Sequence, residues 1–183
     1  GEALKRLKAR DLPPRSVAIA FDDGTYDFYR QAYPLLRKRG LPVTVYQTTY
    51  YSDHKAPVFN LICSYMLWKR RGDQPAAVPE LGLKEPLDLR TEASRHRIVR
   101  TLIERSEREN LTGADKNKIA EQLAAALGID YAALSASRIL QLMNAQEVSE
   151  IARDGVDVQL HTHRHRTPED EALFCREIVD NRS

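Results

Sequence analysis

The hydrophobic pattern at the start of the chain predicts a strand, a helix and a second strand. A continuous apolar run over 16–21 is typical of a strand buried on both faces of a parallel sheet. Residues 28–39 carry an amphipathic helical pattern, and 42–48 are rich in β-branched and aromatic residues. This order of elements indicates a right-handed crossover between parallel strands, and hence an α/β fold.

The middle of the chain departs from this pattern and predicts helices. Residues 50–143 contain no run that is typical of a buried strand. We expect one short helix in this segment to begin at Ser135 or Ser137. The longer segments expected to be helical are 57–70, the residues that follow Thr91, and 114–127.

The α/β pattern resumes near Asn144. Asn144 and Glu147 have the spacing of a capping box, which predicts the start of a helix. Residues 156–160 alternate between apolar and polar and predict a third strand. Thr167 and Pro168 predict the start of the last helix, because threonine caps helices and proline is accepted at the first helical position.

These elements predict a single partial domain over residues 1–183. Its α/β scaffold comprises 10–49 and 144–183, and the largely helical segment 50–143 is an insertion after the second strand. A chain of 183 residues is long enough to bury one hydrophobic core. It has neither an initiator methionine nor a signal peptide, so we expect it to be a piece of a longer gene product.

The composition narrows the class of protein. The chain is 42% hydrophobic and 30% charged, and no stretch approaches a membrane span, so we expect a globular domain without a transmembrane segment. A formal net charge of +2, without interleaved basic and aromatic residues, argues against a nucleic-acid partner. Cys63 and Cys175 are isolated, which disfavours a disulfide framework or a cysteine-based zinc site.

Adjacent carboxylates follow the first predicted strand, in the sequence Phe21-Asp22-Asp23-Gly24. Adjacent side chains at a strand end point in different directions, so one carboxylate can bind a cation while the other accepts a proton. An ordinary Asp-Gly turn with a capping aspartate is the simpler interpretation. An aspartyl-phosphate phosphatase is disfavoured, because Phe21 stands where its nucleophile would be.

Three of the five histidines follow the third predicted strand, within 161–165. His161 and His165 share one side whether this segment is extended or helical, whereas His163 shares it only in an extended segment. His163 is therefore the weaker candidate for a ligand. The alternative interpretation is an exposed loop rich in histidine and arginine.

The two motifs together predict a metal site. Both follow strands, and the carboxyl ends of parallel strands meet at one edge of a sheet. We expect Asp23, His161 and His165 to bind one divalent ion, which is Zn²⁺ or else Co²⁺, Ni²⁺ or Mn²⁺. Asp22 would act as the base toward a metal-activated water, so these residues favour hydrolysis of an amide or ester carbonyl.

The sequence Phe-Asp-Asp-Gly at 21–24 and the later His-Thr-x-x-His at 161–165 resemble the first two signature motifs of the polysaccharide deacetylases, carbohydrate esterase family 4. The resemblance extends over about 10–48 and 144–180. It implies the N-terminal part of a distorted (β/α)7 barrel. It also implies a hydrolase that removes N- or O-linked acetyl groups from a polysaccharide or cell-envelope glycan.

The resemblance also assigns roles to single residues. It makes Asp22 the catalytic base, makes Asp23, His161 and His165 the metal ligands, and gives Thr162 the task of stabilising the loop. It implies an extracellular, periplasmic or cell-envelope location. The later family motifs, including the general acid, are expected beyond the end of the chain, so this piece alone is expected to be weakly active or inactive.

Other residues are candidates for contact with the acetylated glycan or with the ligands. Tyr50 and Trp68 could stack on a sugar ring, and His163 could support a ligand or the substrate. Two alternative functions remain at this point. One is a catalytically inactive carbohydrate-binding or assembly domain of the same fold, and the other is a related amidohydrolase that acts on a small non-peptide C–N substrate.

Overall fold

The computed structural model describes residues 2–52 and 55–182, and the chain divides into two compact units. The sheet unit comprises 1–55 and 142–183, and the helical unit comprises Ala56–Gln141. The expected domain limits at 1 and 183 lie outside the described residues. None of the helices in the described part of the chain has the length and apolar composition needed to cross a bilayer.

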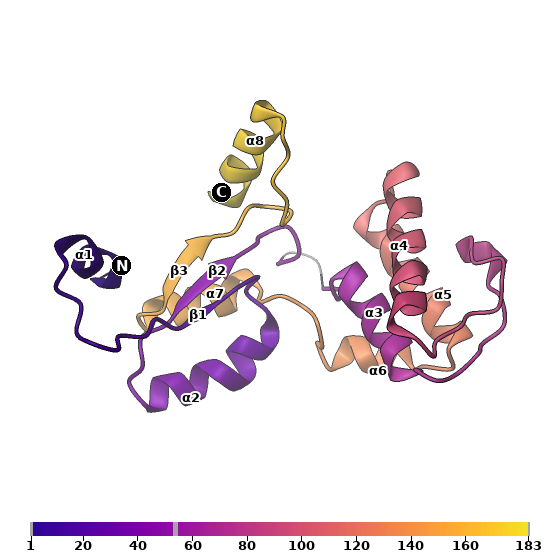
Figure 1. Ribbon diagram of the computed structural model, residues 1–183, viewed down its shortest axis with the longest axis horizontal. Helices are drawn as coiled ribbons and strands as arrows, with labels where there is room; N and C mark the ends of the chain where they lie inside the picture. Colours follow the sequence, from indigo (N-terminus) through magenta and orange to yellow (C-terminus); the bar gives the residue numbers. More distant parts are fainter. Residues whose placement is uncertain (1, 53–54, 183) are drawn as a thin grey trace. The chain divides into compact units, whose positions relative to one another are not determined.

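Three short parallel strands form the sheet, in the order β1-β2-β3 (Figure 1). Phe21 pairs with Val45, which pairs in turn with Val158. The parallel pairing confirms the predicted sheet and brings the residues that follow each strand to a common edge, with the end of β2 in the middle. The strands are β1 (Ala20–Phe21), β2 (Thr44–Gln47) and β3 (Asp157–Leu160).

The first strand is shorter and more exposed than the sequence predicts. Only Ala20 and Phe21 belong to β1, and the side chain of Val17 is 86% exposed. The prediction of a strand over 16–21 buried on both faces is therefore wrong. The first four residues of the apolar run lie outside the strand, because the pairing of β1 with β2 starts only at Ala20 and Thr44.

The sheet unit has a small core, to which three of its helical elements contribute. Residues predicted to form one helix are divided between a π-helix, η1 (Phe28–Ala32), and α2 (Tyr33–Lys38), because Pro34 occupies the first turn of α2. The capping box predicted at Asn144 is confirmed at the start of α7 (Ala145–Arg153). The remaining helix before the sheet is α1 (Glu2–Ala9). The buried core residues are Phe28, Tyr33, Val43, Val45, Met143 and Ile151.

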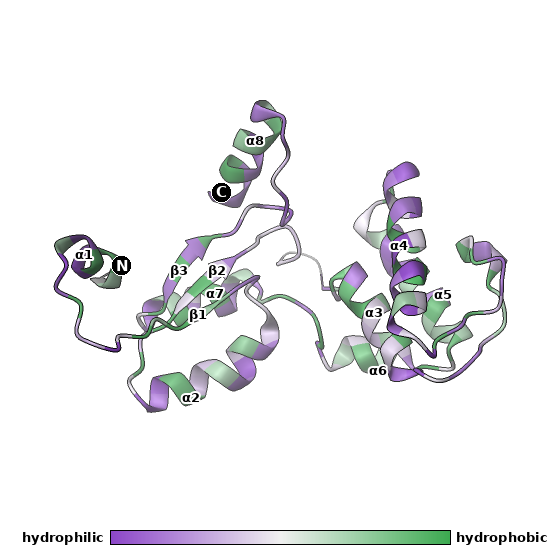
Figure 2. Ribbon diagram, in the orientation of Figure 1, coloured by the Kyte–Doolittle hydropathy of each residue, from purple (hydrophilic) through white to green (hydrophobic). Residues whose placement is uncertain are grey.

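The last helix, α8 (Glu171–Arg182), begins later than the sequence predicts. The side chain of Asp170 accepts the backbone N–H of Leu173 at 2.9 Å and so caps the helix. The predicted start at Thr167 and Pro168 is wrong, because aspartate is a stronger helix cap than threonine. Hydrophobic and hydrophilic residues both occur along α8 (Figure 2).

The helical unit forms its own core. The helices predicted over 57–70, after Thr91 and over 114–127 are confirmed as α3, α4 and α5. They share a buried cluster to which each contributes fully buried side chains. The elements are α3 (Phe59–Lys69), the 3₁₀-helix η2 (Pro79–Leu81), α4 (Glu92–Arg108), α5 (Gly113–Ala126) and α6 (Tyr131–Ala136).

The short helix α6 begins before the serines that were expected to start it. Its N-cap is Asp130, whose side chain accepts the backbone N–H of Ala133 at 2.9 Å. Ser135 lies inside the helix and Ser137 follows it as the C-cap. The predicted start at either serine is therefore wrong, for the same reason as in α8.

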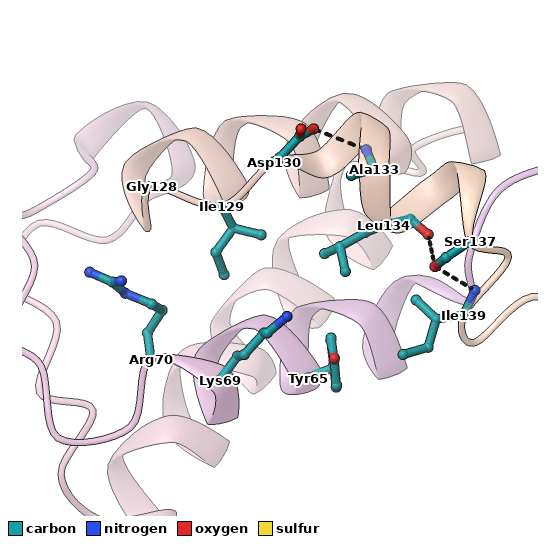
Figure 3. A pocket seen from close by; sticks show the side chains of 10 residues that line it. All are labelled: Tyr65, Lys69, Arg70, Gly128, Ile129, Asp130, Ala133, Leu134, Ser137 and Ile139. Carbon is teal, nitrogen blue, oxygen red and sulfur yellow. Dashed lines mark hydrogen bonds between the residues drawn. The ribbon is translucent and has the colours of Figure 1, made fainter.

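A hollow of about 570 Å³ opens on the helical unit, between α3 and the segment around α6 (Figure 3). The Tyr65 ring and the Lys69 ammonium group line one side, and Leu134 and Ile139 line the other. None of the residues predicted to form the functional site lines this hollow.

Candidate metal centre

Sharp turns after β1 and β3 position the residues predicted to bind metal. Asp23 follows β1 and has a φ of 69°, and the next residue, Gly24, has a φ of 70°. Two successive left-handed residues turn the chain away from the strand, and aspartate and glycine tolerate that conformation better than most residues. His161 directly follows β3, at the same edge of the sheet.

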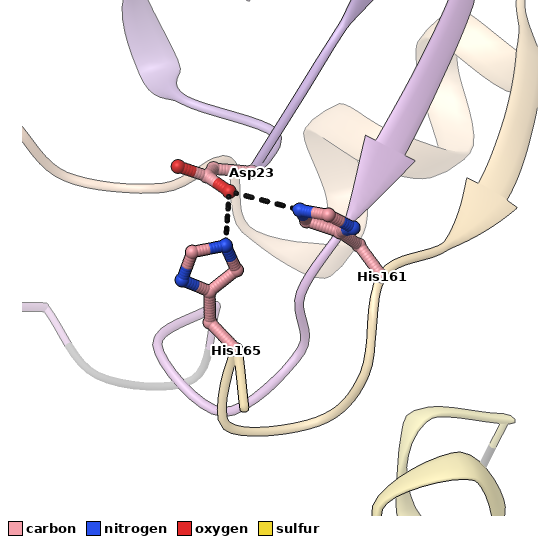
Figure 4. A group of neighbouring side chains, drawn as sticks. All are labelled: Asp23, His161 and His165. Carbon is pink, nitrogen blue, oxygen red and sulfur yellow. Dashed lines mark ion pairs between the residues drawn. The ribbon is translucent and has the colours of Figure 1, made fainter. Parts of the chain in front are cut away.

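Asp23, His161 and His165 converge (Figure 4). The Oδ1 atom of Asp23 lies 3.3 Å from Nε2 of His161 and 3.2 Å from Nε2 of His165. One ligand atom from each of the three residues lies within 4.8 Å of the others. In a tetrahedral zinc site with ligand bonds of about 2.0–2.1 Å, neighbouring ligand atoms lie about 3.3 Å apart. The observed spacing therefore fits one shared cation.

The donor set and the hydrogen bonding of Asp23 support the same interpretation. Oδ1 of Asp23 is buried, and its contacts with Nε2 of His161 and Nε2 of His165 lack the geometry of a hydrogen bond. A buried acceptor without a well-aligned hydrogen bond is costly, and a cation shared with the two imidazoles would satisfy it. Two imidazoles and a carboxylate form a three-residue set that suits zinc and leaves a position open to water or substrate.

The loop between the two histidine ligands has an unusual backbone. Thr162 has a φ of 60° and His165 a φ of 54°. The left-handed region is rare for a β-branched residue such as threonine, and such strained residues gather at functional sites. The Thr162 hydroxyl accepts the backbone N–H of Arg166 at 3.1 Å, which closes the loop as a compact turn.

The structure places the other predicted site residues in different surroundings. Asp22 is exposed beside Asp23. His163 lies outside the group of three ligands: its Nδ1 atom is 2.8 Å from the Thr49 hydroxyl, and its carbonyl oxygen accepts the backbone N–H of Tyr50 at 2.9 Å. The rings of His163 and Tyr50 meet edge to face, with centroids 5.5 Å apart.

Trp68, the remaining candidate, belongs to the helical unit and is 49% exposed. Its ring stacks on Tyr65 with centroids 6.0 Å apart, and the guanidinium group of Arg71 lies 4.4 Å from its centre. These are contacts within α3 and the turn that follows it. A role for Trp68 in stacking on a sugar stays a prediction.

Two buried polar residues of α8 support the loop, and the sequence interpretation missed both. Glu177 is 2% exposed and Asn181 is 4% exposed. Burial acts to raise the pKa of Glu177, but hydrogen bonds from Arg164 and Arg166 outweigh it and hold that pKa below its usual value. The signal available in the sequence was a pair of polar residues one helical turn apart, at 177 and 181.

The polysaccharide deacetylase family model matches residues 9–177. The chain belongs to the polysaccharide deacetylase family. This confirms the resemblance carried by the two motifs, and it supports a deacetylase-type hydrolase of a family that is generally metal-dependent. Neither a curated protein nor a solved structure matches the chain. The mixed α/β architecture is consistent with the family fold, and the barrel and the insertion stay predictions.

Proposed function

We propose that this polysaccharide deacetylase is a metal-dependent hydrolase that removes N- or O-linked acetyl groups from a polysaccharide or cell-envelope glycan. The convergence of Asp23, His161 and His165 is the observation that supports it most strongly. These side chains would hold Zn²⁺, or else Co²⁺, Ni²⁺ or Mn²⁺. When bound, the ion supplies Lewis-acid chemistry that polarises the acetyl carbonyl and activates water.

Asp22 would act as the general base in this reaction. It is exposed and adjacent to Asp23, and side chains of neighbouring residues at a strand end diverge. Asp22 can therefore face the attacking water while Asp23 faces the imidazoles. Its carboxylate would take the proton from that water as the new carbon–oxygen bond forms.

The surroundings of the metal site suggest where the glycan would bind. Tyr50 and His163 contact each other beside the loop that carries the ligands, and both are partly exposed. They are our candidates for contacts with the sugar next to the acetyl group, while Thr162 keeps the loop closed through its hydroxyl. An envelope glycan as substrate would place the protein in the cell envelope, in the periplasm or outside the cell.

The metal assignment is tested by elemental analysis of the purified protein and its variants. Asp23→Ala and His161→Ala should each lose the bound ion, because each removes one of the three candidate ligands among the described residues. His163→Ala is the matched control, since it removes a neighbouring imidazole that lies outside the ligand group, and it should retain the ion. Equal metal content in all four proteins would refute the assignment.

The catalytic assignment needs a separate assay. Acetate release from acetylated chitooligosaccharides should be measured in the full gene product, together with its Asp22→Asn variant. The proposal expects release that falls by at least about 10²-fold in the variant, as is typical when a general base is removed. A non-catalytic carbohydrate-binding domain would bind the oligosaccharides but release no acetate in either protein.

A further inference from the structure

One amide side chain joins the ends of two strands at the metal site. Oδ1 of Asn181 accepts the backbone N–H of His161 at 2.9 Å. The Nδ2 atom of Asn181 donates to the carbonyl oxygen of Gln47 at 3.1 Å and to the Thr49 hydroxyl at 3.0 Å. Asn181 thus connects the end of β2 to His161, the first residue after β3.

The same helix holds the second half of the loop through Glu177. Its carboxylate accepts the backbone N–H of Arg164 at 2.7 Å, and the guanidinium groups of Arg164 and Arg166 at 2.9 and 3.1 Å. The carbonyl oxygen of Glu177 accepts the backbone N–H of His163 at 3.1 Å. Because 163 and 164 lie between the two histidine ligands, these contacts fix the segment that sets the ligand spacing.

The hydrogen bonds of Asn181 continue to His163. The Thr49 oxygen accepts from Asn181, so its hydrogen is available to Nδ1 of His163, which lies 2.8 Å away. This contact holds the His163 ring against the end of β2. It explains why the middle histidine stays outside the group formed by Asp23, His161 and His165.

The backbone of the loop indicates why such support is needed. Left-handed φ angles at Thr162 and His165 raise the energy of the loop, and such residues persist only where the surrounding structure fixes them. We infer that Asn181 and Glu177 are positioning residues, which hold the two imidazoles at the spacing that the metal requires. This inference rests on the proposed metal site, but it also predicts behaviour of the metal-free protein.

The first test measures zinc affinity by competition with a chromophoric chelator. Asn181→Leu removes every hydrogen bond of this amide and should weaken binding about 10- to 100-fold, the usual effect of losing support for a ligand. Arg176→Ala is the matched control on the same helix, because its side chain is 70% exposed and pairs with Asp180. It should bind zinc like the wild type. Wild-type affinity in Asn181→Leu would overturn the inference.

A more conservative variant keeps the test valid where Asn181→Leu fails to fold. Asn181→Asp retains an acceptor for the N–H of His161 but loses the donor to the Gln47 carbonyl oxygen. It should weaken zinc binding less than Asn181→Leu and more than Arg176→Ala. Affinities are compared at a temperature at which circular dichroism shows each protein to be folded, so that global unfolding does not enter. Wild-type affinity in Asn181→Asp would likewise overturn the inference.

The second test needs no metal. The His161 N–H donates to Oδ1 of Asn181 at 2.9 Å and also to the carbonyl oxygen of Gln47 at 3.1 Å. Its hydrogen exchange in the metal-free protein should be faster in Asn181→Leu, which removes the shorter of these two bonds and the amide that holds Gln47 in place, and unchanged in Arg176→Ala, which removes neither. Unchanged exchange in Asn181→Leu would overturn the inference. A wild-type protein that binds no zinc would refute the proposed function, and the exchange result would then decide the positioning role by itself.

Discussion

Replacing Gly24 with alanine should destabilise the sheet unit by far more than the same change at an open glycine. A Cβ atom at Gly24 would lie 1.8 Å from Oε1 of Gln47, and the φ of Gly24 is +70°. Gln47 is 4% exposed, and its Nε2 atom donates to the carbonyl oxygen of Thr48 at 2.7 Å and to the Ser52 hydroxyl at 3.0 Å. The added methyl group must displace this amide.

The magnitude follows from two contributions. The left-handed backbone costs a non-glycine residue about 1–2 kcal/mol. Loss of the two Gln47 hydrogen bonds adds about 0.5–1.5 kcal/mol each, so the total for Gly24→Ala is about 2–5 kcal/mol. Gly40 is the matched control, because it has a φ of +61° and nothing within 4 Å of a Cβ atom. Gly40→Ala should cost only the backbone contribution, about 1–2 kcal/mol.

The assay must report on the correct unit. Trp68 is the single tryptophan and lies in the helical unit, so its fluorescence does not follow unfolding of the sheet. Urea denaturation, monitored through hydrogen exchange of the peptides that contain β2, measures the free energy of unfolding of the sheet unit directly. Equal destabilisation by Gly24→Ala and Gly40→Ala would contradict the close packing of Gln47 over Gly24.

Three further changes test separate features. Glu177→Gln should reduce the free energy of unfolding at neutral pH. Hydrogen bonding holds the pKa of Glu177 in the folded protein below its usual value. The stabilisation by the Glu177 carboxylate is therefore present above the unfolded-state pKa and is lost as the pH falls through the lower folded-state pKa. Denaturation curves of the two proteins should therefore converge in acid, and a constant difference would refute the assignment. Asp22→Asn should retain its zinc while acetate release falls, so loss of the metal would show that Asp22 is a ligand. Tyr33→Phe should cost about 1 kcal/mol, measured by urea denaturation, because the partly buried hydroxyl donates to Asp154; an unchanged midpoint would contradict that contact.

The candidate ligands could be found from the sequence because their signal is local. Asp23 and His161 each directly follow a run with strand character, and parallel strands bring such residues to one edge of a sheet. The spacing of His161 and His165 keeps both on one side in either backbone conformation. Short-range pattern and one topological rule were sufficient to place these three residues together.

The support from α8 could not be found in the same way. Glu177 and Asn181 are polar residues of an ordinary helix, and their burial arises only because the loop folds back over them. For the apolar run that ends at Phe21, the sequence predicted more structure than is present. Hydrophobicity indicated a strand over 16–21, but only Ala20 and Phe21 have a neighbouring strand with which to pair.

The core of the helical unit shows the same limit. The segment between α3 and α4 contains several prolines and glycines, and four of its leucines are buried in this core. They lie around η2 and before α4, outside the α-helices and strands of the described residues, although alternate positions within 81–83 and 87–89 are leucine. These residues are Leu81, Leu83, Leu87 and Leu89.

The X-ray absorption spectrum of the zinc-loaded protein tests most directly whether Asp23, His161 and His165 share one ion. We expect a first shell at about 2.0–2.2 Å made of nitrogen and oxygen, with the outer-shell scattering of two imidazoles. His161→Ala and His165→Ala do not retain the ion through purification, so they are measured with one equivalent of added zinc, and their imidazole signal should then be half that of the wild type. A spectrum without imidazole scattering, or one that neither substitution changes, would contradict the site on which this account depends.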